Sequence, residues 1–467
     1  MKQQLFLRGK PSFIFNQGTF IADCATSLQT SITSVLNPGR LDVLARQSGF
    51  LRRESKFKPE EFIDTLMFSD PDHSLLSLQD CCNDLAQQHQ KSLSKVAFHK
   101  RFNPRSLDFL KLVLAEQMAL KLDIEPGSNW GPFSRVLIVD SSKFSMPKQY
   151  KDDYPGFGGA RGLSGMMNIQ YSFDLKNGDW ENLELTKATQ NDQSYSKKTL
   201  DRIGEGELHI RDLGYVTIAY MAKVVSKQSF FLNRLHPNLD PVQCSTGKLI
   251  NWAALYQKMK HNKDIRMETM VTLGKGKEAF ECRLIAVPVP EQVWAERMRK
   301  AQKQAKSHGS ALSDEYKERC RFSLFITNAK EDILKAVDII QLYRLRWQIE
   351  LIFKAWKSTL NIHKVKAVKT ERLECQLIAK FIWILLNWKI FRNIDAFVQK
   401  NSSDYACSIL KFYKQAKRYS QALRKVATGI VSFCHWCEIF LCPIIKSLLI
   451  EDKRGKKSAY MIVHDIF

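Results

Sequence analysis

The stretch RVLIVDSSKF, residues 135–144, is the clearest indication that this chain contains a β-sheet. Four apolar residues run directly into Asp140 with no helical period, which is typical of a buried strand. The pattern predicts a strand that ends at this acid. Because loops at strand ends expose side chains at the edge of a rigid sheet, α/β proteins often place functional groups there.

A β-hairpin is predicted immediately downstream, over residues 165–189. Two runs rich in strand formers are joined there around Asn177–Gly178, the dipeptide that most strongly favours a tight hairpin turn. After a helix expected over 195–204, the segment ELHIRDLGYV, residues 207–216, forms another strand that runs into Asp212. Two aspartates therefore follow strands on either side of a hairpin and a helix.

A helix expected to begin near residue 331 contains the stretch YRLRWQIELIFKAWK, residues 343–357. At about 100° per residue, one stripe roughly 60° wide holds four polar residues: Tyr343, Arg346, Glu350 and Lys357. The neighbouring arc is apolar and suits packing on a core. The cations and the phenol can hold phosphate oxygens while the carboxylate holds a metal ion. The alternative is an exposed, salt-bridged helix face.

The candidate metal ligands are thus Asp140, Asp212 and Glu350. If the sheet and the helix pack as one mixed α/β unit, the three carboxylates converge and hold two divalent ions about 3.5 to 4 Å apart. One ion would activate water or a 3′-hydroxyl, and the other would stabilise the leaving oxygen of an in-line displacement at phosphorus. Oxygen ligands suit Mg²⁺ or Mn²⁺ better than zinc.

Each aspartate also has a plainer interpretation, as a turn residue or a helix cap. Three other aspartates compete for the catalytic role: Asp174, Asp192 and Asp201. Asp174 lies beside the predicted hairpin turn, and Asp192 precedes a helix that it can cap. Neither is at a buried strand end, so the sequence favours the first set.

The charge balance favours a polyanionic partner. The 467 residues include 71 Lys and Arg against 48 Asp and Glu, a formal charge of +23 with a pI near 9.5. Nucleic acid is the usual partner of such a chain. No membrane role is expected: residues 1–15 lack the apolar core of a secretory signal, and 429–445 is too short and too polar to span a bilayer. Eleven cysteines without a disulfide or zinc pattern indicate a reducing cytoplasm.

Three domains are predicted along the chain. Residues 1–125 are mainly helical, and a helix, a break and a second helix over 73–102 suggest a helix-turn-helix. The second helix would present four DNA-binding residues: Lys95, His99, Lys100 and Arg101. Residues 126–369 form the α/β catalytic unit, interrupted by a β-rich insertion at about 225–322. Residues 370–467 are helical again, with a basic run at 453–457, and suit dimerisation or DNA contact.

The spacing of Tyr343, Arg346, Glu350 and Lys357 matches the Y-(2)-R-(3)-E-(6)-K signature, so the chain resembles transposases of the insertion-sequence-four family. Three further segments are similar to family sequences: VLIVDSSKF at 136–144, IRDLGY at 210–215 and SGFLRRESKFKPEEF at 48–62.

The resemblance implies a ribonuclease-H-like core with an Asp-Asp-Glu triad, in which Asp140, Asp212 and Glu350 bind the metal ions. It also implies that the cations and the phenol of the signature hold DNA phosphates near the cut. Such enzymes excise a mobile element at its terminal inverted repeats and join the ends to target DNA, working as a synaptic dimer. The protein would then be cytoplasmic, and associated with the nucleoid when bound to DNA.

Two alternatives remain open. The chain could be a repurposed transposase that binds DNA without cutting it, although its triad and signature are unbroken. It could also be a metal-dependent nuclease that cuts without joining. The sequence has no glycine-rich phosphate loop, nucleophile elbow or HExxH pair, which disfavours nucleotide-driven motors and other hydrolases.

Overall fold

The computed structural model describes residues 16–70, 75–121, 124, 129–158, 164–401, 405–450 and 459–466. The predictions made for the first 15 residues and for the basic run at 453–457 lie outside these ranges.

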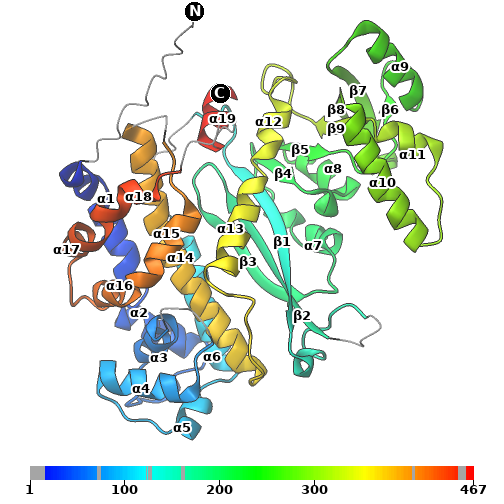
Figure 1. Ribbon diagram of the computed structural model, residues 1–467. Helices are drawn as coiled ribbons and strands as arrows, with labels where there is room; N and C mark the ends of the chain where they lie inside the picture. The colour runs from blue at the N-terminus through cyan, green and yellow to red at the C-terminus, as the bar shows by residue number, and fades with distance from the viewer. Residues whose placement is uncertain are drawn as a thin grey trace, which may run out of the picture.

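One mixed sheet of nine strands extends from the middle of the molecule to one end of it (Figure 1). The strands are β1 (Val136–Met146), β2 (Gly165–Asp174), β3 (Trp180–Lys187), β4 (Leu208–Arg211), β5 (Phe230–Arg234), β6 (Val242–Gln243), β7 (Met267–Leu273), β8 (Phe280–Pro288) and β9 (Phe322–Thr327). Their order is β3-β2-β1-β4-β5-β9-β8-β7-β6. Strands β1 to β3 are antiparallel, whereas β4 and β5 run parallel to β1. This sheet, with helices at both ends of the chain, confirms the predicted α/β class with a ribonuclease-H-like core.

Strand β1 does not end at Asp140, as the sequence suggested, but continues for six residues to Met146. Its pairing with parallel β4 covers only Val136 to Val139. The rest of β1 is held by antiparallel pairing with β2, down to Met146 opposite Gly165. Asp140 therefore lies in the middle of β1, directly after the last residue that pairs with β4.

The predicted hairpin is confirmed, with β2 and β3 joined by a turn at which Gly178 has φ +78°. Such a backbone conformation favours glycine. Asp174 is fully buried, and its carboxylate accepts hydrogen bonds from the Val136 and Lys176 amides and from Asn177 Nδ2. This aspartate is structural, as predicted, because it ties the turn to the start of β1.

The β-rich insertion is also confirmed and extends the sheet beyond β5. Strand β9 pairs antiparallel with β5, and β8, β7 and β6 follow outward. Four helices accompany this part: α8 (Ile218–Ser226), α9 (Trp252–Asn262), α10 (Glu291–Ser307) and α11 (Asp314–Arg319). A separate hydrophobic core, which includes Phe231, Val271 and Ile326, holds these elements together.

The helices of the two ends of the chain pack against each other on the opposite side of the molecule (Figure 1). The N-terminal set is α1 (Gln17–Ser34), α2 (Pro38–Gln47), α3 (Pro59–Phe68), α4 (Leu78–His89), α5 (Lys95–His99) and α6 (Pro104–Ala119). The C-terminal set is α14 (Thr370–Asn401), α15 (Ile409–Arg418), α16 (Ser420–Ala427), α17 (Phe433–Trp436), α18 (Ile445–Leu448) and α19 (Ala459–Ile466). Helix α14 is buried along most of its length and packs against α1, α3 and α6. One hydrophobic core therefore joins both ends of the chain to the sheet. The division into three domains remains a prediction.

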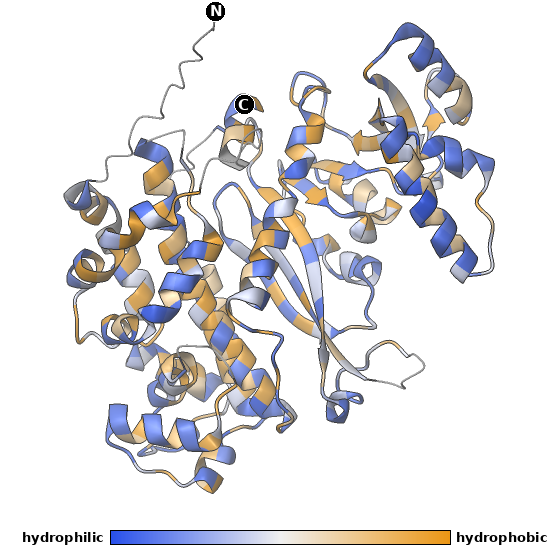
Figure 2. Cartoon of the chain, viewed as in Figure 1, coloured by the Kyte–Doolittle hydropathy of each residue, from blue (hydrophilic) through white to orange (hydrophobic). Residues whose placement is uncertain are grey.

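Hydropathy follows this arrangement. Figure 2 shows α14 mainly apolar, whereas α9 and α10 of the insertion are largely hydrophilic. Within the described ranges, no helix is long and apolar enough to cross a lipid bilayer.

The second helix of the predicted helix-turn-helix is shorter than expected. Ser94 caps α5, its hydroxyl accepting a hydrogen bond from the Ala97 amide, but the helix ends after one turn at His99. Asn103 then caps α6, so the basic residues around position 100 lie at a junction between helices. A single turn cannot present a long recognition face, which weakens the helix-turn-helix comparison.

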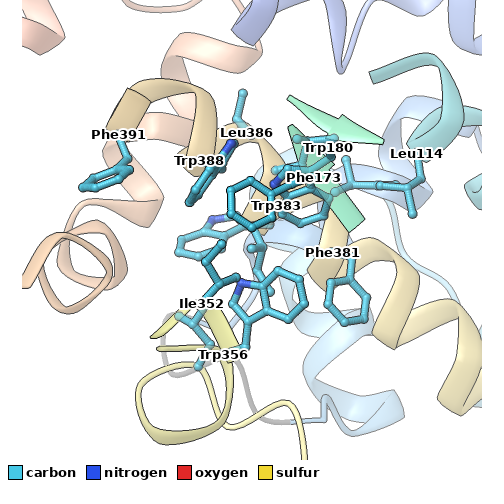
Figure 3. Packing of buried hydrophobic residues seen from close by; sticks show 14 of the residues in the cluster. Leu114, Phe173, Trp180, Ile352, Trp356, Phe381, Trp383, Leu386, Trp388 and Phe391 are labelled. Atoms are coloured by element: carbon cyan, nitrogen blue, oxygen red, sulfur yellow. The ribbon is translucent and has the colours of Figure 1, made fainter. Parts of the chain in front are cut away.

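The long helix predicted from residue 331 is in fact two helices, α12 (Ile339–Arg344) and α13 (Trp347–Ser358). At the junction, the Leu345 and Arg346 amides bond to carbonyls three residues back, which tightens the turn without reversing the chain. The apolar arc of α13 is buried as predicted. Trp356 is completely buried among the rings of Tyr171, Trp180 and Phe381 (Figure 3).

Candidate active site

The register between β1 and β4 brings Asp140 and Asp212 together. Ile138 pairs with Ile210 and Val139 with Arg211, so each aspartate is the next residue after the last parallel pair. Side chains alternate across a strand, and residues in register on parallel strands face the same side. Both aspartates therefore share the face of Ile138 and Ile210, which belong to the main core.

Helix α13 packs on β1 and adds the third carboxylate. The guanidinium of Arg346 lies between the three acids, and each of its nitrogens faces a different one. Nη2 lies 2.6 Å from Glu350 Oε1, Nη1 lies 3.3 Å from Asp140 Oδ2, and Nε lies 3.7 Å from Asp212 Oδ1. The prediction that these carboxylates converge is therefore matched by the geometry.

Burial differs among the four charged groups. The side chain of Arg346 is 10% exposed and that of Asp140 is 20% exposed, whereas Asp212 and Glu350 are 45% and 37% exposed. Burial raises the pKa of Asp140 to about 6, and the other two carboxylates add to this rise against the effect of Arg346. For Arg346, burial is outweighed by the hydrogen bond to Glu350 and by the nearby acids, which raise the pKa of the guanidinium. The site thus holds three acids and one cation in a partly desolvated setting.

Tyr343 and Lys357 lie on either side of this cluster. Tyr343 is mostly buried at the end of α12, and its hydroxyl donates a 3.4 Å hydrogen bond to the Arg211 carbonyl, next to Asp212. Burial raises the pKa of Tyr343 to about 12. Lys357 lies two turns beyond Glu350, and its Nζ donates to the Lys143 carbonyl of β1, 2.8 Å away. The four residues of the signature therefore lie along the ends of β1 and β4, although they come from two helices and the junction between them.

Asp192 lies next to the site and has a different role from the one that its position in the sequence predicts. It was expected to cap a helix, but the cap of α7 (Asp192–Lys198) is Asn191, and Asp192 is the first helical residue. Its Oδ1 accepts hydrogen bonds from the Ser141 hydroxyl at 3.0 Å and from Gln170 Nε2 at 3.3 Å. Ser141 follows Asp140 and points to the opposite face of the sheet.

Asp192 also contacts the turn after Asp212. A Cβ added to Gly214 would lie 3.1 Å from Asp192 Oδ2, so a larger residue there would require Asp192 to shift by a few tenths of an ångström. Tyr215 completes the network by donating a 2.5 Å hydrogen bond to Gln170 Oε1. Asp192 therefore connects the two segments that carry Asp140 and Asp212. No local sequence signal separates this role from capping, because Asn191 and Asp192 both have side chains that cap helices.

The N-terminal residues predicted to bind DNA lie elsewhere, in α5 and the turn after it. Lys95 and Lys100 are exposed, and His99 is half-buried. Arg101 lies over the ring of Phe57, 5.1 Å from its centroid. The structure gives none of them a contact with the three carboxylates, so any contact that they make with DNA is separate from the site.

The donor set fits a hard divalent cation. Three carboxylates from separate segments offer oxygen ligands. The guanidinium of Arg346 lies among them and balances part of their negative charge, as a bound cation would. Among the residues that the structure describes, no three His, Cys, Asp or Glu side chains are grouped tightly enough to enclose a metal ion directly. The acids are gathered around Arg346, so the guanidinium must move if an ion is to reach all three.

Comparisons with known proteins agree with this geometry. A family model described as "Transposase DDE domain" matches residues 131–386, which is more than half of the chain and includes all three carboxylates. The chain is 27% identical to the transposase for insertion sequence element IS231B of Bacillus thuringiensis subsp. berliner, over 84% of this chain and 87% of that protein. It is 26% identical to the transposase for IS1151 of Clostridium perfringens, over 92% and 93%. It is 24% identical to the transposase for IS421 of Escherichia coli, over 74% and 88%. The chain therefore belongs to the insertion-sequence transposases with a DDE domain, which are metal-dependent enzymes of DNA cleavage and strand transfer.

Proposed function

We propose that this transposase works by cut and paste: it binds the terminal inverted repeats of its element, cleaves the DNA there and joins the released ends to target DNA. The observation that carries the proposal is the meeting of three carboxylates from distant segments around the guanidinium of Arg346. In cleavage, water attacks the phosphodiester at the end of the element, so that a new P–O bond leaves a 5′-phosphate on the flanking strand and the 3′-hydroxyl of the element departs as the leaving group. In joining, that hydroxyl attacks a phosphate of the target DNA, and the target strand leaves as the new P–O bond forms.

Asp140, Asp212 and Glu350 are the proposed ligands of Mg²⁺ or Mn²⁺, two ions per site. When bound, such ions supply Lewis-acid activation of the attacking oxygen and stabilise the leaving one. The β-sheet and α13 hold the three ligands on rigid elements, which limits the cost of ordering them.

The remaining residues of the signature are proposed to hold the DNA strand. Arg346 can offer a planar pair of donors to a phosphate once it leaves the acids, and Lys357 can offer a compact positive charge. The hydroxyl of Tyr343, close to Asp212, can donate to a neighbouring phosphate oxygen. Lys95, His99, Lys100 and Arg101 are proposed to touch DNA farther from the cut.

The larger assembly is also part of the proposal. Two copies of the chain would bring two element ends together as a synaptic homodimer, with the helices after residue 370 available for contact between copies or with DNA. A DNA substrate places the protein in the bacterial cytoplasm, at the nucleoid when bound.

The test uses purified protein, Mg²⁺ and a labelled duplex that carries the inverted repeats flanking the coding region, together with the Glu350→Gln variant. We expect a metal-dependent cut at the repeat boundary and joining of the end to a plasmid by the native protein. The variant should bind the duplex and leave it intact, because an amide is a poorer ligand for a divalent ion than a carboxylate.

Each alternative function predicts a different result in this assay. A cut without joined product would identify a nuclease. Binding without any cut by the native protein would identify a DNA-binding protein descended from a transposase. Cleavage retained by Glu350→Gln would remove Glu350 from the metal site.

A further inference from the structure

A small cleft among the N-terminal helices has several arginines in its lining. It lies between the loop that joins α2 to α3 and the turn that leads into α6, and has a volume of about 310 Å³. Four arginines line it: Arg52, Arg53, Arg101 and Arg105. Glu54 is the single acid in its lining. The cleft therefore concentrates positive charge in one hollow, and its lining includes none of the three carboxylates of the active site.

These arginines lack the carboxylate partners that other arginines in the helical part of the molecule have. Arg40 pairs with Glu116, Arg46 with Asp42, and Arg424 with Asp64 and Asp84. In the described part of the chain, none of the four cleft arginines forms an ion pair with a carboxylate. Grouping like charges without counterions costs free energy, so the arrangement favours an anion in the cleft.

Two of the four side chains are held in place by packing. Gly49 has φ +71°, and a Cβ there would lie 3.4 Å from Arg105 Cδ, so the glycine lets the loop pass close to the stem of Arg105. The guanidinium of Arg101 rests over the ring of Phe57. The positive end of the 16-residue helix α6 begins at Pro104, next to both arginines. The cleft is therefore partly organised before any ligand arrives.

We infer that this cleft binds the phosphodiester backbone of the duplex at a point separate from the cut, an inference that rests on the proposed function for the choice of DNA as the ligand. Guanidinium groups suit phosphate because their planar donors match two of its oxygens. Such contacts position the duplex and carry no base sequence. The principal N-terminal contact is thereby assigned to the loop at 49–55 together with Arg101 and Arg105, and not to the face of α5.

The test compares two pairs of substitutions that remove the same charge. Arg52→Ala with Arg53→Ala alters the cleft, whereas Arg40→Ala with Arg46→Ala removes two exposed arginines that are already paired. A second cleft pair, Arg101→Ala with Arg105→Ala, covers the other wall. Fluorescence anisotropy is measured without metal, over a range of salt, with a labelled repeat-end duplex and with a scrambled duplex of the same length. Thermal unfolding of each variant checks that the fold is intact.

We expect either cleft pair to weaken binding at least tenfold, equally for both duplexes, and to lower the salt slope by roughly two because each phosphate contact contributes about 0.9. The control pair should weaken binding less than about threefold, because lost net charge acts weakly at a distance in salt. Equal losses in cleft and control variants would overturn the inference, as would a loss restricted to the repeat-end duplex. Metal-dependent cleavage by the native protein is scored separately, so a failed cleft and a failed transposase are distinguishable.

Discussion

Arg346 and Glu350 lie one turn apart at the start of α13, and Arg346 Nη2 donates a 2.6 Å hydrogen bond to Glu350 Oε1 while the same guanidinium faces Asp140 and Asp212. The bond uses the i, i+4 spacing of the helix. Its wider effect is to supply positive charge to three acids that would otherwise repel one another. A divalent ion bound by the same acids would therefore compete with this guanidinium for them.

This relationship predicts that Arg346→Ala raises the affinity of the DNA-free protein for Mn²⁺, by about tenfold if one charge-assisted hydrogen bond is the obstacle. The acids lose their internal cation, so an ion no longer competes with it. Isothermal titration with Mn²⁺ measures the change directly. Lys357→Ala is the matched control, because Lys357 donates to a backbone carbonyl and to none of the acids. Unchanged or weaker Mn²⁺ binding by Arg346→Ala would show that the guanidinium does not compete with the ion for the three acids.

Asp192→Ala is predicted to slow cleavage about tenfold to a hundredfold, with DNA binding unchanged, because the segments bearing Asp140 and Asp212 lose their common anchor. Single-turnover cleavage and anisotropy measure the two effects. Asp192→Asn should restore most of the rate, since its amide oxygen still accepts from the Ser141 hydroxyl. Asp201→Ala, an exposed aspartate of the same region, is the control. A binding defect as large as the rate defect in Asp192→Ala would point to a general loss of structure.

Trp356→Ala is predicted to lower the free energy of unfolding by about 3–5 kcal/mol, the range for emptying a buried aromatic site. The ring of Trp356 lies 4.9 Å from that of Tyr171 and 5.3 Å from that of Trp180, centroid to centroid, and is inaccessible to solvent. Chemical denaturation gives the value. Trp347→Ala, on the same helix but 59% exposed, should cost little. Similar costs for the two variants would contradict the burial of the α13 face.

Lys380→Met is predicted to stabilise the protein at pH 7 by about 1–3 kcal/mol, because it replaces a buried ammonium by an apolar side chain of similar length. Burial lowers the pKa of Lys380 to about 8, whereas an unfolded lysine titrates near 10.4. Between these values the unfolded chain binds more protons, so native stability rises with pH across that window.

The advantage of the variant should therefore be full below pH 8 and shrink as the pH rises towards 10. Urea unfolding at pH 7, 8, 9 and 10 measures it. Lys354→Met, at an exposed position of α13, serves as the control and should show no such trend. A constant advantage from pH 7 to 10 would mean that folding does not lower the pKa of Lys380.

The structure departs from sequence-based expectation where long-range packing competes with local preference. The apolar run before Asp140 predicts a strand, but the end of β1 depends on pairing with β2, in which Met146 lies opposite Gly165. Asn191 and Asp192 are both good caps, and the choice between them depends on Ser141 and Gln170. Helical periodicity across 343–357 survives the break between α12 and α13, because the junction keeps helical backbone angles.

By itself, the sequence determined the class of fold and the basic charge, and it predicted the three acids and their accompanying cations. These features depend on residue type and short spacing, which are local properties of the chain. Only the tertiary structure decided that Arg346 lies among Asp140, Asp212 and Glu350, and that Asp192 contacts the segments of two of them from the opposite face of the sheet. It also decided that four arginines share a cleft in which Glu54 is the single acid. Electrostatic interaction depends on distance and burial, and both are set only when segments far apart in the chain pack together.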